Sequence, residues 1–196
     1  MNKDFLLCGV GGQGTVLASK LIAAAAMAAG ETVHSAETIG MAQRGGSVTS
    51  HVRVGERAHS PLIGTGCADV IIAFEPAEAV RNLHLLKKDG WVIVNQVPVK
   101  PVTASLLGDS YDGKEVLQYL RQKVANLVVV DGKKLEQALG SPKYFNVAIL
   151  GVAVGTESTG LPSELVVREI EKRVPPKFIE KNKEAFAMGM EIGRKG

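Results

Sequence analysis

Residues 5–14 have the sequence FLLCGVGGQG, an apolar run that leads directly into a glycine-rich turn. A short and wholly apolar run is typical of a strand buried in a parallel sheet. The Ala-rich segment that follows predicts a helix over residues 15–29, with Gly30 as the residue that ends it. A second strand, expected over residues 32–36, completes a strand–helix–strand unit, the building block of an α/β fold.

The rest of the sequence continues this alternation, apart from an irregular excursion expected over residues 96–113, which carry several prolines and glycines. From Asn146 onward the pattern is wholly helical. The further predicted elements are strands over 69–74, 91–95 and 127–131, and helices after Pro76, over 114–123, 133–139, 146–156 and 162–173, and from Pro176 to about Ile192.

One segment breaks the parallel pattern. Val48, Val52 and Val54 fall in an alternation of apolar and polar residues, which is the period of a half-buried strand. Gly55-Glu56 has the composition of a tight II′-type turn, so this strand is expected to pair as a hairpin with residues 57–60. The sequence therefore predicts an antiparallel ribbon inserted into the sheet.

Length and composition fit one domain. The chain has 196 residues, of which 45% are hydrophobic and 22% charged, enough apolar material for one packed core. No long linker or repeat divides it, so residues 1–196 are expected to form a single domain. We predict a three-layer, Rossmann-like α/β fold: a mostly parallel sheet with an antiparallel ribbon insertion and a helical C-terminal third.

Composition also excludes several classes of protein. A net charge of +3 and only 5% aromatic residues do not favour nucleic-acid binding. The longest apolar run, residues 21–29, is too short and too rich in Ala to span a membrane. The two cysteines, Cys8 and Cys67, can form neither a disulfide framework nor a four-cysteine metal site. A soluble, cytoplasmic protein of a reducing compartment is therefore expected.

The first glycine-rich segment is a candidate binding loop. Gly9, Gly11 and Gly14 match the pattern G-x-G-x-x-G, which places backbone N–H groups and a helix N-terminus around a phosphate. With Gly12 and Gln13 they are candidate cofactor-binding residues. A turn that only allows helix and strand to pack closely is the alternative interpretation. A Walker A site is excluded, because no Gly-Lys-Ser/Thr follows the loop.

A second segment combines the residue types that bind anions. It consists of Gln43, Arg44, Gly45, Gly46 and Ser47, at the end of a long loop. An arginine beside paired glycines and a serine offers a positive charge, permissive backbone N–H groups and a hydroxyl, which together can hold a phosphate or a carboxylate. A solvated turn that leads into a strand is the alternative.

A catalytic set is not visible in the sequence. His34, His51, His59 and His84 show no metal-ligand spacing, and there is no Gly-x-Ser-x-Gly nucleophile elbow. The acidic residues form no recognisable acid–base pair, and both cysteines are interpreted as small packing residues. We therefore predict neither catalytic nor metal-binding residues in this chain.

Several segments together resemble the gamma-type domain of the 2-oxoacid:ferredoxin oxidoreductase family. They are the first glycine loop, residues 41–48 (MAQRGGSV), residues 68–75 (ADVIIAFE) and the late segment 182–189. The resemblance extends over nearly the whole chain, and residues 41–48 are its specific part. Indolepyruvate-type members of the family carry this domain as a separate chain of similar length.

The resemblance implies an enzyme subunit that is inactive alone. In the family, a larger partner subunit holds thiamine diphosphate with magnesium and iron–sulfur clusters; it decarboxylates a 2-oxo acid, reduces ferredoxin and transfers the acyl group to coenzyme A. Indolepyruvate-type members act on aryl pyruvates. Coenzyme A thereby becomes the ligand expected at the two glycine segments. An apolar surface that faces the partner would leave the isolated chain as a homo-oligomer or as a monomer that associates non-specifically. Neither a nucleic acid nor a membrane is expected as a partner.

Three alternatives remain open. The chain could be the gamma subunit of a pyruvate, 2-oxoisovalerate or 2-oxoglutarate ferredoxin oxidoreductase. It could be an NAD(P)-dependent Rossmann protein, with Glu31 or Glu37 roughly where the acid that binds the ribose would lie. It could also be a non-catalytic assembly module that binds a nucleotide.

Overall fold

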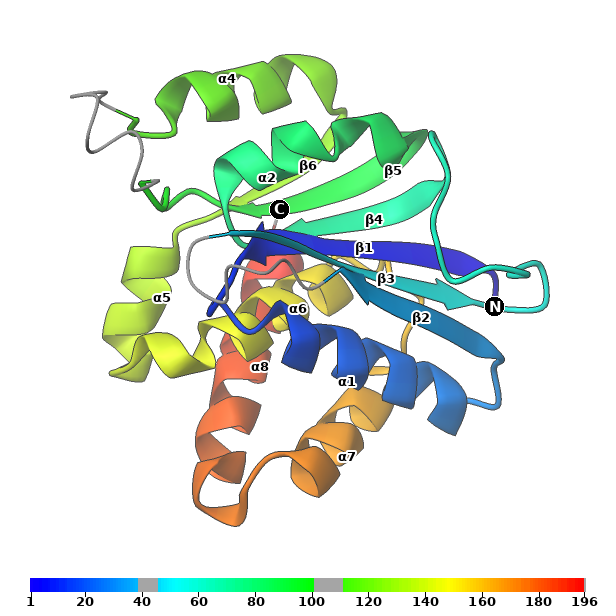
Figure 1. The fold of residues 1–196 in the computed structure, drawn as a ribbon. Coiled ribbons are helices and arrows are strands. Elements are labelled where there is room, and N and C mark those ends of the chain that lie inside the picture. Colours follow the sequence, from blue (N-terminus) through cyan, green and yellow to red (C-terminus); the bar gives the residue numbers. More distant parts are fainter. Residues whose placement is uncertain (39–45, 101–110, 196) are drawn as a thin grey trace.

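A six-stranded sheet with the strand order β2-β3-β1-β4-β5-β6 runs through the described part of the molecule (Figure 1). The computed structural model describes residues 1–38, 46–100 and 111–195. The strands are β1 (Lys3–Val10), β2 (Val33–Thr38), β3 (Ser47–Val54), β4 (Ala68–Ala73), β5 (Leu86–Asn95) and β6 (Asn126–Val130). The helices are α1 (Thr15–Ala28), α2 (Pro76–Arg81), α4 (Lys114–Lys123), α5 (Gly132–Leu139), α6 (Phe145–Gly155), α7 (Ser163–Arg173) and α8 (Ile179–Gly193), with short 3-10 turns η1 (Leu83–Leu85), η2 (Pro142–Tyr144) and η3 (Pro176–Phe178).

The strand directions confirm the predicted fold class. β1, β4, β5 and β6 pair with one another in parallel, in that order across the sheet. β3 runs antiparallel to both of its neighbours, β1 and β2. The sheet is therefore mostly parallel with an antiparallel insertion, and α6, α7 and α8 form the predicted helical C-terminal third.

The predicted pairing partner of the inserted strand is wrong. β3 pairs along its full length with β1, and its other edge is occupied by β2. Both edges of β3 are therefore paired, and residues 57–60 form no strand. Gly55, with φ +105°, donates its N–H to the Thr32 carbonyl oxygen at 2.8 Å and lets the chain turn away from the sheet. Pairing with two longer strands satisfies more backbone groups than a hairpin with a four-residue segment would.

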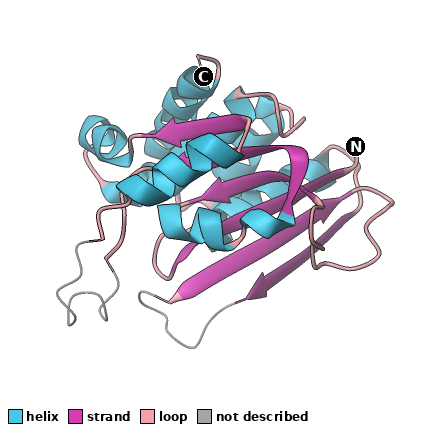
Figure 2. Ribbon diagram, turned by 90° about the horizontal axis from the view of Figure 1, so that it is seen from above, coloured by secondary structure: helices cyan, strands magenta, loops and turns pink. Residues whose placement is uncertain are grey.

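Helices cover both faces of the sheet, as Figures 1 and 2 show from two directions. Successive side chains of β1 point to opposite faces. Phe5 and Leu7 belong to the apolar cluster that includes α1 and α6, whereas Leu6 and Cys8 belong to the cluster that includes α2 and α4. α7 packs on α1 and α8 packs on α6, outside the first helical layer. Burying a large apolar side chain fully stabilises the folded state by about 1.5–3 kcal/mol. The apolar clusters on the two faces therefore both stabilise the sheet.

α6 is the innermost helix, with every residue from Phe145 to Gly155 buried. Its contact with α8 depends on glycines. A Cβ atom at Gly151 would overlap the carbonyl oxygen of Phe186, and one at Gly189 would overlap that of Ala148. The two backbones therefore touch directly, which no larger residue at these positions permits.

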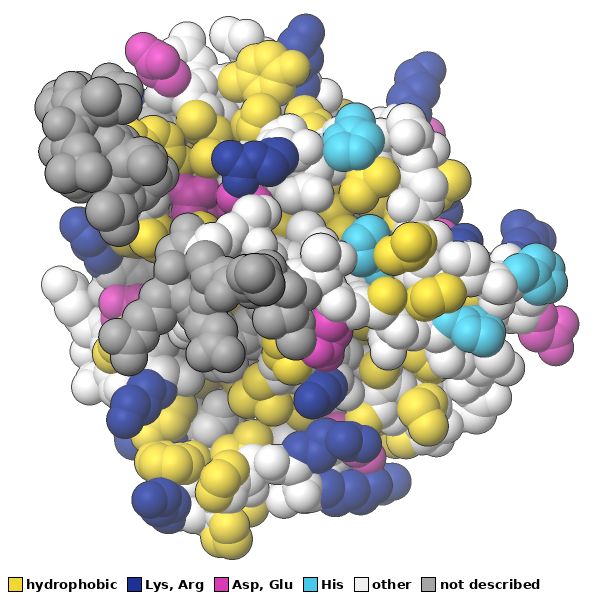
Figure 3. All heavy atoms as spheres, in the orientation of Figure 1, with side chains coloured by type: hydrophobic (Ala, Val, Ile, Leu, Met, Phe, Trp, Pro, Cys, Tyr) yellow, Lys and Arg dark blue, Asp and Glu magenta, His cyan; other side chains and the backbone are white. Residues whose placement is uncertain are grey.

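On the face seen in Figure 3, basic and acidic side chains both occur among apolar ones, and the basic ones gather over the lower part of the view. Of the helices that the structure describes, none combines the length and the apolar character needed to cross a lipid bilayer.

The contact between α6 and α8 makes a testable prediction. Gly189→Ala should lower the free energy of unfolding by about 1–3 kcal/mol, because the added methyl group forces two helix backbones apart. The intrinsic helix propensity of alanine exceeds that of glycine by about 0.8–1 kcal/mol, which would by itself stabilise the variant. A loss of stability must therefore come from the packing of the two helices. Urea unfolding followed by circular dichroism measures it.

Gly64→Ala is the matched control, because a Cβ there would lie 3.7 Å from the Cys67 Sγ, an ordinary contact. It should unfold with nearly the parent free energy. A Gly189→Ala protein as stable as the parent would show that the two helices are not in backbone contact.

Candidate functional site at the carboxyl edge of the sheet

The sheet has a topological switch point between β1 and β4. These two strands are parallel neighbours, yet the chain leaves β1 for α1 on one face and leaves β4 for α2 on the other (Figure 1). In open α/β sheets, ligands bind in the crevice that forms where adjacent strands send the chain to opposite faces. The glycine loop predicted from the sequence, residues 9–14, lies at this point.

The side chain of Gln13 bridges the switch point. Its Oε1 accepts the N–H of Val10 at 2.8 Å, and its Nε2 donates to the carbonyl oxygen of Phe74 at 3.1 Å. The Nδ2 of Asn95, at the end of β5, donates to the same carbonyl oxygen at 3.1 Å. The side chains of Gln13 and Asn95 therefore join the carboxyl ends of β1, β4 and β5. The N–H of Val10 already has a hydrogen-bond partner inside the loop.

The glycines of the loop have different roles. A Cβ at Gly9 would overlap the Oε1 of Gln13 and lie 2.9 Å from the Cβ of Phe74, so Gly9 is required by close packing. Gly14 has φ +82°, and a Cβ there would overlap the side chain of Asn146, which reaches it from the start of α6. Gly12 has φ +98°, but a Cβ there would have no heavy atom of the described residues within 4 Å. Of these three, Gly12 is therefore the position where the described part of the chain leaves space beside the backbone.

The structure brings part of the second glycine segment to the same place. The carbonyl oxygen of Gly46 accepts the N–H of Gly11 at 2.9 Å, and the Ser47 Oγ donates to the Glu78 Oε2 at 2.6 Å. Gly46 and Ser47 therefore lie beside the first loop. The other predicted members of this segment, Gln43, Arg44 and Gly45, fall outside the described residues.

Two buried carboxylates that the sequence analysis missed lie directly behind this edge. Glu75 caps α2, since its Oε2 accepts the N–H of Glu78 at 3.1 Å, and its Oε1 accepts the hydroxyl of Tyr111 at 2.6 Å. Glu78 is paired with Arg81 and accepts the hydroxyl of Ser47. The sequence Glu75-Pro76-Ala77-Glu78 did carry a signal, because an acceptor before a proline, followed by an acid in the first turn, is a helix-start pattern.

This environment also shapes two neighbouring groups. Burial raises the pKa of the Cys8 thiol, and the negative charges of Glu78 and Glu75 raise it further. Burial and the hydrogen bond to Glu75 raise the pKa of Tyr111 in the same way. Both groups therefore stay protonated near neutral pH, so Cys8 acts as a packing residue and Tyr111 as a hydrogen-bond donor.

The acids considered for a nicotinamide ribose do not lie at the loop. Glu31 is paired with the amino group of Met1, and Glu37 lies on β2 opposite Ser50 of β3. Because β3 separates β2 from β1, the end of β2 is about 5 Å further from the glycine loop than in a fold where these two strands are neighbours. This spacing disfavours the NAD(P) alternative.

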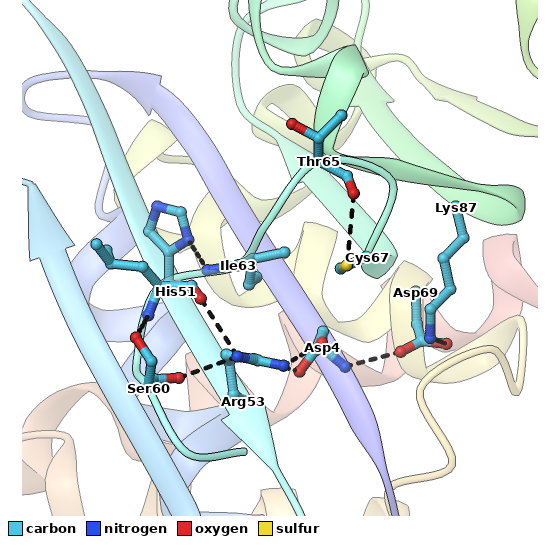
Figure 4. A network of polar contacts seen from close by, with 10 residues as sticks. Asp4, His51, Arg53, Ser60, Ile63, Thr65, Cys67, Asp69 and Lys87 are labelled. Carbon is cyan, nitrogen blue, oxygen red and sulfur yellow. Dashed lines mark hydrogen bonds and ion pairs between the residues drawn. The ribbon is translucent and has the colours of Figure 1, made fainter. Parts of the chain in front are cut away.

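His51 contributes to the fold. His51 lies on β3, and its Nδ1 accepts the N–H of Ile63 at 3.2 Å, which pins the loop after β3 onto the sheet (Figure 4). Beside it Arg53 makes two contacts with Asp4, at 2.9 and 3.1 Å, and also donates to the Ser60 carbonyl oxygen. Among the residues that the structure describes, no group of three or more His, Cys, Asp or Glu is arranged to hold a metal ion.

Comparison with known proteins identifies the class of domain. Residues 4–192 match the family described as pyruvate ferredoxin/flavodoxin oxidoreductase. The chain belongs to this family.

Its full-length relatives are subunits of oxidoreductases. Indolepyruvate oxidoreductase subunit IorB of Archaeoglobus fulgidus is 38% identical over 190 residues, which cover 96% of this chain and 94% of that protein. The IorB subunit of Pyrococcus horikoshii is 35% identical over 193 residues, which cover 97% and 96%. The common gamma subunit of the pyruvate/ketoisovalerate oxidoreductases of Pyrococcus abyssi is 33% identical over 181 residues, which cover 90% and 89%. The expectation of a small subunit of the 2-oxoacid:ferredoxin oxidoreductase type is confirmed.

Solved structures agree on the fold. The pyruvate oxidoreductase subunit PORC of Thermotoga maritima superposes with a TM-score of 0.69 and 26% identity, covering 97% of this chain and 96% of that one. A 2-oxoglutarate:ferredoxin oxidoreductase from Magnetococcus marinus superposes with a TM-score of 0.73 and 18% identity, covering all of this chain but 31% of that one. The same fold thus also occurs as one part of a longer oxidoreductase chain.

The His51 contact predicts how stability depends on pH. Burial, assisted by the positive charge of Arg53, lowers the pKa of His51 below its usual value of 6.5, so the folded protein favours the neutral ring. As pH falls from about 8 to about 5.5, the unfolded chain takes up a proton that folded His51 resists, and the free energy of unfolding should fall. His51→Gln should reduce this slope, measured by urea unfolding at several pH values.

Exposed His59 supplies the control, since His59→Gln should keep the parent slope. Equal slopes for His51→Gln and the parent protein would contradict the assignment.

Proposed function

We propose that this chain is the small subunit of an indolepyruvate-type ferredoxin oxidoreductase. The observation that carries the proposal is the match to IorB subunits along almost the whole of both chains, at 35% and 38% identity. The enzyme would convert an aryl pyruvate and coenzyme A to an arylacyl-CoA and carbon dioxide. The two electrons released would pass one at a time to ferredoxin.

The redox groups would belong to a larger partner subunit. This chain has only two cysteines, and an iron–sulfur cluster of the usual kind needs four cysteine thiolates. Cys8 is moreover fully buried beside two glutamates, which disfavours its thiolate. The cysteines of this chain are therefore too few to hold a cluster. We assign thiamine diphosphate, magnesium and the clusters to the larger partner subunit.

The role of this chain would be to bind coenzyme A at the carboxyl edge of the sheet. The ligand carries phosphate groups, and the start of α1 presents the positive end of a helix there. Gly12 leaves room for a close approach, and Arg44, from the specific part of the family resemblance, would supply the charge. The internal bonds of Val10 and Gly11 mean that the loop would hold phosphate through its later residues rather than through these two N–H groups.

Arg44→Ala tests this ligand assignment. Loss of a charge-assisted hydrogen bond to phosphate costs about 1.5–3 kcal/mol, so the KM for coenzyme A should rise roughly ten- to a hundredfold while the complex still assembles. Arg57→Ala, an exposed arginine after the far end of β3, is the matched control and should leave this KM unchanged. An unchanged KM in the Arg44→Ala complex would remove Arg44 from the site.

The subunit assignment itself is tested by anaerobic affinity purification of this chain from its host. A brown eluate that contains a larger cysteine-rich subunit and reduces ferredoxin in the presence of a 2-oxo acid and coenzyme A is the expected result. Aryl pyruvates should be used faster than pyruvate, 2-oxoisovalerate or 2-oxoglutarate. A preference for one of those three would replace indolepyruvate by that substrate, and a colourless eluate of this chain alone, as monomer or homo-oligomer, would contradict the assignment.

A further inference from the structure

Glu78 is a buried carboxylate whose contacts leave its own helix. It lies in the first turn of α2 and is 3% exposed. One oxygen is paired with Arg81, and the other accepts the hydroxyl of Ser47 at 2.6 Å, at the start of β3. Removing a carboxylate from water is costly, and the cost is offset only when its ion pair and hydrogen bonds are well formed. The partners of a buried carboxylate therefore indicate what it is used for.

A second buried glutamate provides a comparison inside the same molecule. Glu169 of α7 is 4% exposed and accepts from Lys172 at 2.7 Å and from Arg173 at 3.0 Å. Both of its partners lie on its own helix, and the carboxyl edge of the sheet is not involved. Glu78 has the same kind of partner three residues along its helix but in addition reaches another segment of the chain.

That segment leads directly to the glycine loop. Ser47 follows Gly46, and the carbonyl oxygen of Gly46 accepts the N–H of Gly11 at 2.9 Å. A continuous series of contacts therefore runs from the Glu78 carboxylate through Ser47 and Gly46 to Gly11. On its other side the loop is held by Gln13, which donates to the Phe74 carbonyl oxygen. The loop is thus fixed from both sides of the switch point.

We propose that Glu78 is a positioning residue: through Ser47 and Gly46 it holds the glycine loop in the shape that receives a phosphate group of coenzyme A. This proposal rests on the proposed function of the loop. Glu78 does not touch the ligand, and its charge is matched by Arg81, whose side chain is 60% exposed. The pair therefore presents no uncompensated negative charge to an arriving anion.

The test uses the assembled enzyme with three variants. Glu78→Leu removes the acceptor for Ser47, Glu78→Gln keeps an oxygen that can accept the same hydroxyl, and Glu169→Leu removes the matched buried glutamate. Two quantities are measured: amide hydrogen exchange of the peptide that covers residues 9–14, and the KM for coenzyme A alongside kcat. Glu78→Leu should speed exchange in this peptide and raise the KM roughly three- to tenfold with little change in kcat.

The other two variants separate positioning from general stability. Glu78→Gln should restore most of the exchange protection and the KM, whereas Glu169→Leu should lower the melting temperature without affecting either quantity. If Glu78→Leu does not fold, Ser47→Ala takes its place in the exchange measurement. Unchanged exchange at residues 9–14, or an equal effect from Glu169→Leu, would overturn the proposal.

The parent enzyme distinguishes this failure from failure of the proposed function. Added coenzyme A should slow exchange at residues 9–14 of the parent complex. If it does not, the loop is not the coenzyme A site, and the ligand assignment fails whatever the Glu78 variants do. If it does, and Glu78→Leu leaves the KM unchanged, the ligand assignment stands and the role given to Glu78 is wrong.

Discussion

The hydrogen bonds of Gln13 join the carboxyl ends of the paired strands β1 and β4, where the chain turns to opposite faces of the sheet. β1 and β4 diverge at their carboxyl ends, which would leave the Val10 N–H and the Phe74 carbonyl oxygen without partners in the sheet. The amide of Gln13 satisfies both groups, and Asn95 adds a second donor to Phe74. Since buried backbone groups without partners are costly, this bridge stabilises the switch point from within the chain.

The C-terminal helices support this arrangement from below. α6 is wholly buried and brings Asn146 against Gly14, where its Nδ2 lies 3.5 Å from the carbonyl oxygen. The position of α6 is in turn set by α8, because glycines such as Gly151 and Gly189 let the two backbones touch. A change of spacing between these helices would therefore be felt at the glycine loop, even though α8 contributes no residue to it.

The sequence predicts where helices and strands lie much better than which strands pair and which side chains contact one another. Apolar runs such as residues 69–74 become buried strands, because burial on both faces of a parallel sheet demands continuous hydrophobicity. The pairing of β3 was missed, since alternation indicates that a strand is half-buried but not which neighbour it takes. Glu75 and Glu78 were missed for a related reason: the hydroxyls that donate to their buried carboxylates, those of Tyr111 and Ser47, are distant in sequence.

The glycine fingerprint illustrates why a motif has to be interpreted together with its neighbours. In a dinucleotide fold the strand beside β1 carries the acid that binds the ribose, and the loop N–H groups face the pyrophosphate. Here β3 occupies that neighbouring position, and the first N–H groups of the loop bond to Gln13 and to Gly46. The loop therefore connects strands β1, β3 and β4 through these hydrogen bonds. An anion would have to be bound by groups other than the N–H groups of Val10 and Gly11. In this chain the fingerprint therefore stands in a strand arrangement that differs from that of a dinucleotide-binding fold.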